Sequence, residues 1–96
     1  MTLSEFKSSL KLNTPPAEIS LALRALWEDG RGNWDAAHKL AQEVEGKSGA
    51  WIHAYLHRKE GDLGNAAYWY RQAGRPAAHD ALEEEWDRIV GALIEP

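Results

Sequence analysis

Apolar side chains recur at intervals of three and four residues along most of the chain, the spacing that places them on one face of an α-helix. Leu3, Phe6 and Leu10 begin the pattern, and it continues almost to the end of the sequence. No segment alternates apolar and polar residues for long enough to indicate a β-strand. The pattern therefore predicts an all-α protein with six helices.

Glycine, proline and capping residues divide this pattern into elements. Pro15 and Pro16, after Thr14, predict the start of the second helix, because proline is tolerated in the first helical turn. Asn33 and Asp62 stand in positions typical of helix N-caps. The expected elements are a short helix at 3–12, a first helical pair at 15–46, a second pair at 49–76 and a final helix at 77–94.

The two helical pairs contain related sequences. Gly32 is followed by Asn33 at the first turn, and Gly61 is followed by Asp62 at the second turn, 29 residues later. The helices that precede the two turns match in the same register. A repeated helical pair cannot bury its apolar face alone, so repetition on this scale predicts hairpins that stack against each other in one domain.

Composition limits the classes of function. The 96 residues suffice for one domain, and a hydrophobic content of 44%, with five tryptophans, suffices for a small core. A formal net charge of −4 and dispersed basic residues argue against nucleic-acid binding, which requires clustered lysine and arginine. The chain has no cysteine, no signal-peptide pattern and no apolar run near the ~20 residues of a membrane span. We therefore expect a soluble, cytoplasmic protein without a membrane partner.

The second helical pair resembles a tetratricopeptide repeat, a family that places glycine at the inter-helix turn and small and aromatic residues at fixed positions after it. The matching residues are Gly61, Asp62, Leu63, Ala66, Tyr70, Ala73 and Pro76, and the earlier pair keeps Ala25, Gly32 and Ala37. The resemblance implies a right-handed stack of antiparallel helical hairpins with a C-terminal capping helix. It also implies a role in binding rather than in catalysis.

Two histidines depart from that family pattern. His53 and His57 stand where the family has apolar packing, so either the helices are rotated or polar groups lie between them. One helical turn separates the two histidines, as in two-histidine metal sites, but zinc needs a third ligand. His38, Asp35 or Glu60 could supply it only if the fold brought them close. The simpler interpretation, which we favour, is a polar stripe whose histidines are solvated or bonded to the backbone, with no metal and no cofactor.

Polar side chains also share one face of the fifth predicted helix. Tyr68, Arg71 and Arg75 are spaced to hold a carboxylate, a phosphate or a sugar acid, because arginine pairs with oxyanions through two hydrogen bonds. A solvated helix face is the simpler explanation of the same pattern. At the adjacent turn, Glu60 can pair with Arg58 or with a histidine.

The remaining candidates are aromatic and acidic. Trp51 and Trp69 lie at the margins of their apolar stripes and are expected to be partly exposed, whereas the other three tryptophans are expected in the core. Three consecutive glutamates, Glu83 to Glu85, are interpreted as a solvated face that suits the positive end of the final helix.

These patterns support two hypotheses of function. The leading hypothesis is an interaction module that binds a protein partner or a second copy of itself. The alternative is a small-molecule-binding protein or a minor enzyme, with its site between the helices of 49–76. Its ligand would be anionic or sugar-like. A His53/His57 pair buried in a pocket would favour the alternative. The predicted binding surface comprises Trp51, His53, His57, Arg58, Glu60, Asn65, Tyr68, Arg71 and Arg75.

Overall fold

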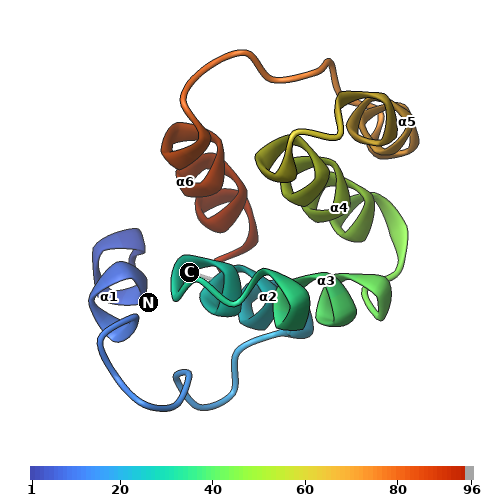
Figure 1. Cartoon of the computed structure of the whole chain (residues 1–96). Helices are drawn as coiled ribbons and strands as arrows, with labels where there is room; N and C mark the ends of the chain where they lie inside the picture. Colours follow the sequence, from blue (N-terminus) through green and yellow to red (C-terminus); the bar gives the residue numbers. More distant parts are fainter. Residues whose placement is uncertain (95–96) are drawn as a thin grey trace.

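The computed structural model describes residues 1–94, and these form six α-helices with no strand, as the sequence predicts (Figure 1). The helices are α1 (Leu3–Ser9), α2 (Leu21–Gly30), α3 (Trp34–Gln42), α4 (Gly46–Glu60), α5 (Leu63–Ala73) and α6 (Leu82–Leu93). Consecutive helices pack on each other, α2 on α3 and α4 on α5. The predicted pairing of neighbours is therefore present.

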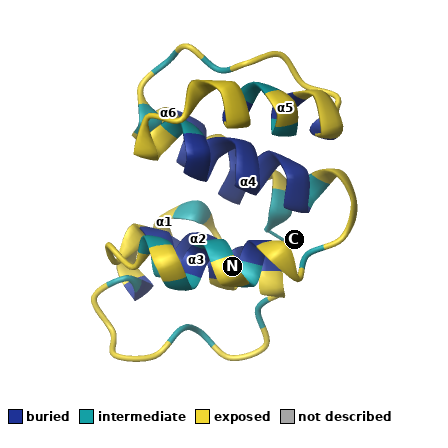
Figure 2. Cartoon of the chain, turned by 45° about the vertical axis from the view of Figure 1, so that its right-hand side comes forward, coloured by how far each residue is buried: buried dark blue, intermediate teal, exposed yellow. Residues whose placement is uncertain are grey.

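Helix α4 occupies the centre of the molecule. It contacts α5, α3, α6 and α2, and every residue from Gly49 to His57 is buried (Figure 2). A helix buried on all sides must satisfy its polar side chains within the protein. Helix α4 carries several such side chains, and their partners define the polar chemistry of the fold.

The two inter-helix turns have the same backbone structure. Gly32 and Gly61 both adopt left-handed conformations, with φ of 86° and 90°. At the first turn the N–H of Asn33 donates to the carbonyl of Glu28 at 2.9 Å, and at the second the N–H of Asp62 donates to the carbonyl of His57 at 2.9 Å. This is the Schellman arrangement that ends a helix at glycine. The related glycines predicted from the sequence thus close equivalent turns.

Three predicted helix starts are wrong. Helix α2 begins at Leu21 rather than near Pro15, because Ser20 caps it by accepting a hydrogen bond from the N–H of Leu23. The last helix begins at Leu82, and the segment after Pro76 is not helical. Helix α4 begins at Gly46, in the stretch that was expected to form the turn after the first pair.

Helix α1 packs against α6. Its N-terminus has a capping box, in which Thr2 and Glu5 exchange hydrogen bonds. Phe6 is fully buried against Trp86, with ring centroids 5.8 Å apart, and Lys7 pairs with Asp87 at 3.2 Å. These contacts attach α1 to α6.

Candidate functional site

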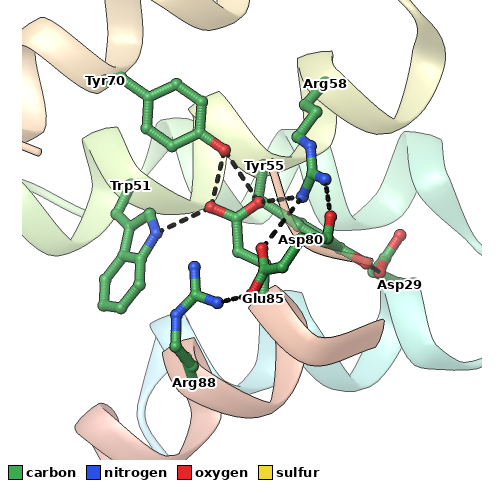
Figure 3. Close-up of polar contacts among 8 residues, drawn as sticks. All are labelled: Asp29, Trp51, Tyr55, Arg58, Tyr70, Asp80, Glu85 and Arg88. Carbon is green, nitrogen blue, oxygen red and sulfur yellow. Dashed lines mark hydrogen bonds and ion pairs between the residues drawn. The ribbon is translucent and has the colours of Figure 1, made fainter. Parts of the chain in front are cut away.

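The first polar cluster surrounds Glu85, which is 0% exposed (Figure 3). The prediction that Glu85 belongs to a solvated acidic face is therefore wrong. Its carboxylate accepts hydrogen bonds from the Tyr70 hydroxyl at 2.6 and 2.8 Å, from the Trp51 indole N–H at 3.1 Å and from Arg58 at 2.8 Å. Arg58 also donates to the backbone carbonyl of Asp80. The Glu85 network joins α6 to α4 and α5.

The Glu85 network is chemically closed. Both carboxylate oxygens have donors, and the buried charge has a cation beside it, as buried charges require. Burial and the hydrogen bond to Glu85 raise the pKa of Tyr70, so its hydroxyl stays protonated and donating at neutral pH. We interpret the network as structural, because both oxygens of the buried carboxylate already have donors from the protein.

A second buried carboxylate, Asp29, is satisfied in the same way. It is 2% exposed, and it accepts from the Tyr55 hydroxyl at 3.0 Å and from the Lys59 ammonium at 3.0 Å. Burial, followed by the nearby Asp29 charge, raises the pKa of Tyr55. These hydrogen bonds of Asp29 fix α2 to α4.

The second polar cluster, the histidine cluster, contains His38, His53 and His57. One candidate ligand atom from each imidazole lies within 4.8 Å of those of the other two. His53 and His57 are 6% and 7% exposed, so they are not solvated, and His53 instead has the backbone bond that the sequence left as the other possibility, to Gly49. His38 comes from α3 and is half-buried, and its ring meets those of His53 and His57 edge-on, with centroids 5.0 and 5.2 Å away.

Two tryptophans enclose the histidine cluster. The Trp34 ring stacks on His38 with centroids 4.9 Å apart, and its indole N–H donates to the carbonyl of Leu56 at 2.9 Å, which fixes α3 against α4. On the other side, Trp69 of α5 stacks on His53 with centroids 4.3 Å apart. The cluster therefore lies between three helices, with aromatic walls that limit its contact with water.

The protonation state of the cluster follows from its surroundings. Burial, together with the neighbouring imidazoles, lowers the pKa of His53 to about 4, and burial also lowers the pKa of His38. Both rings are neutral near pH 7 and carry lone pairs. His57 Nδ1 lies 2.6 Å from a Glu60 carboxylate oxygen, which can only accept, so Nδ1 carries a proton and Nε2 is the ring's other nitrogen.

The predicted binding-surface residues divide among several places. His53, His57 and Glu60 come together in the histidine cluster. Trp51 and Arg58 instead belong to the Glu85 network, and Trp51 is 6% exposed, so its expected partial exposure is wrong. Trp69 is half-buried, as expected, while Trp34, which was expected in the core, is only half-buried.

The polar residues expected on one face of the fifth helix have different surroundings, and Arg75 follows the end of α5. The Arg75 guanidinium lies over the Trp51 ring, 3.4 Å from its centroid. Tyr68 and Arg71 are exposed, as a solvated helix face requires, and Asn65 is exposed at the start of α5, where its N–H donates to the Asp62 cap.

His38 is the residue of the histidine cluster that the sequence analysis named only as a conditional third ligand. It lies one turn after Trp34 on α3, and the two positions share a helix face. The signal in the sequence was a tryptophan and a histidine at positions i and i+4 of one helix, next to the helix that carries the histidine pair. The sequence alone did not show that these two faces meet.

Comparisons with known proteins add no further guide to this site. No known protein family, no curated protein and no solved structure matches the chain. Among the described residues, no helix is long and apolar enough to cross a bilayer. The function is therefore argued from the residues themselves.

Proposed function

We propose that this protein binds a small ligand through imidazole nitrogens, and that the histidine cluster is its site. The observation that carries the proposal is the convergence of three imidazoles from two helices, two of them more than nine-tenths buried. Burying polar rings is costly unless they are paired, and core positions in helical stacks are normally apolar. Three histidines that meet between packed helices point to ligand binding rather than to packing.

The other buried polar groups support this contrast. Glu85 and Asp29 have donors from the protein for their carboxylates. Within residues 1–94, His57 donates a hydrogen bond to the Glu60 carboxylate and His53 donates one to the Gly49 backbone carbonyl, which leaves a second nitrogen on each ring. These nitrogens can accept a bond from a ligand.

An imidazole-resolved titration tests the proposal. The side-chain nitrogen signals of all four histidines are followed by NMR while glucose, citrate, inorganic phosphate and zinc are added separately to metal-free protein. We expect at least one probe to shift the signals of His38, His53 and His57 and to leave the exposed His79 unchanged. No response of the three to any probe would contradict the proposal.

A second candidate function is self-association or protein binding by a tetratricopeptide-like stack, through the outer face of α5. The observation that favours it is the exposure of an aromatic ring there, with Tyr68 46% exposed. Aromatic and arginine residues are the usual anchors of protein interfaces, and Arg71 lies beside Tyr68 on the same face. Light scattering on the parent and on a Tyr68→Ala, Arg71→Ala double variant tests it. A partner-free monomer in both would leave self-association without support.

A further inference from the structure

We infer that His38, His53 and His57 hold one divalent transition-metal ion of the zinc class, with the three imidazoles as its protein ligands. The inference rests on the proposed function and names the ligand of that same site. The low weight that sequence reasoning gave to metal depended on finding only two ligands on one helix. Helix α3 supplies the third.

The distances are compatible with coordination after small side-chain rotations. Zinc–nitrogen bonds of about 2.0–2.1 Å in a tetrahedron place ligand nitrogens ~3.3 Å apart. The candidate ligand atoms here lie within 4.8 Å of one another. His53 and His57 are separated by one turn of α4, whose backbone fixes their spacing. His38 is half-buried on α3, so rotation of its side chain can close the remaining gap.

The chemistry of the ligands selects the class of ion. Neutral imidazoles suit zinc, copper, nickel and iron, whereas magnesium and calcium prefer oxygen ligands. The chain has no cysteine, so thiolate ligation is absent. Three imidazoles fill three positions of a tetrahedron and leave the fourth for water or for an atom of a bound molecule, which is the pattern of an open site rather than a closed structural one.

Glu60 acts as a positioning residue for the imidazole of His57. Metal-bound histidines usually donate their other ring N–H to a carboxylate, which fixes the tautomer and makes the ligating nitrogen more basic. His57 Nδ1 lies 2.6 Å from Glu60, which directs Nε2 toward a metal. A ligand atom of Asp62 lies within 4.8 Å of those of His57 and Glu60, so two carboxylates are available near the site to balance the charge of the ion.

The chain provides a matched set of variants. His38 contributes a ring that is only half-buried, so His38→Ala removes one ligand with limited damage to packing. His79 lies in the extended segment before α6 and is exposed, so His79→Ala is the control. Glu60→Gln keeps the size of an exposed side chain and removes its negative charge. Circular dichroism verifies that each variant is folded.

Isothermal titration of metal-free full-length protein with zinc gives the decisive numbers. We expect one zinc per chain, unchanged affinity in His79→Ala, and a loss in Glu60→Gln of roughly 10–100-fold, as for other outer-shell partners of metals. The loss in His38→Ala should be larger than that of Glu60→Gln. In the metal-free state, NMR should also show that Glu60→Gln changes the tautomer balance of His57, which a merely structural role would not do.

The parent alone keeps the inference testable if a variant does not fold. Zinc should shift the side-chain nitrogen signals of the three clustered histidines and leave those of His79 in place. Absence of stoichiometric zinc binding to the parent, or equal affinity in folded His38→Ala, overturns the metal site. If glucose, citrate or phosphate shifts the three signals while zinc does not, the inference fails and the proposed function stands. If no probe shifts them, both fail.

Discussion

Two polar clusters lie on opposite faces of the same buried helix, and they differ in how their hydrogen-bonding capacity is used. Helical periodicity places Trp51, Tyr55 and Arg58 on one side of α4 and His53 and His57 on the other. On the first side, the donors of α4 and α5 meet the carboxylates of Glu85 and Asp29 and satisfy them. On the second side, imidazoles meet imidazoles and tryptophan rings.

The difference separates a structural role from a binding role. A buried charge with a full set of partners fixes the helices and offers nothing to a solute. A buried group of imidazoles with ring nitrogens that have no protein partner has chemistry that the fold does not use. Mutations should therefore affect stability on the first side and ligand binding on the second.

The largest effect on stability is expected from Arg58→Ala. The change leaves the fully buried Glu85 without its cation, and breaking a buried ion pair from one side costs about 3–5 kcal/mol. Urea denaturation followed by circular dichroism measures the free energy of unfolding, with the exposed Arg71→Ala as the control. A loss in Arg58→Ala no greater than that in Arg71→Ala would contradict the structural role of the network.

A smaller loss is expected from Tyr70→Phe. The hydroxyl donates to both oxygens of Glu85, and hydrogen bonds to charged groups contribute about 1.5–3 kcal/mol. Tyr68→Phe removes a hydroxyl from an exposed ring on the same helix and should be neutral in the same denaturation experiment. Equal stability of the two variants would argue that the Tyr70 bond is unimportant.

High pH should destabilise the first side specifically. The pKa values of Tyr55 and Tyr70 are raised in the folded protein, so both remain protonated there while the unfolded chain ionises near its ordinary pKa of about 10. Their contribution is complete below that pH and is lost as pH rises above it, by about 1.4 kcal/mol per pH unit for each tyrosine. Denaturation is measured from about pH 9 to about pH 11, on either side of this ordinary pKa. The free energy of unfolding should fall less steeply with pH in Tyr70→Phe than in the parent.

The smallest effects on stability are expected at His38 and on the outer face of α5. His38→Ala loses stacking on Trp34, a contact worth about 1 kcal/mol. The double change Tyr68→Ala and Arg71→Ala removes exposed side chains and should stay within about 0.5 kcal/mol of the parent. A loss at His38 as large as that in Arg58→Ala would make the cluster structural and remove the distinction between the two sides.

The sequence predicted the helices better than the site. Periodicity and glycine positions located six helices and both Gly32 and Gly61 turns, because these are local properties of the chain. Proline was misleading, since the non-helical segments after Pro15 and Pro76 also accommodate it. The start of α2 depends instead on the side-chain cap of Ser20.

The burial of single polar residues could not be predicted from periodicity. Glu85 and His53 lie on faces that look polar in a helical projection, and each is buried because another helix supplies partners of matching chemistry. Glu85 becomes a core residue only once Tyr70, Trp51 and Arg58 converge on it. His38 joins the site because α3 packs on α4 through the Trp34 indole.

A zinc-dependent thermal melt tests the central contrast most directly. A ligand that binds only the folded chain, at a hundredfold excess over its Kd, adds about 2.7 kcal/mol to stability. For a domain of this size that corresponds to a rise in Tm of roughly 10 °C or more. We expect this rise in the parent and in His79→Ala, and a much smaller one in His38→Ala. No rise in the parent, or the same rise in His38→Ala, would contradict the account.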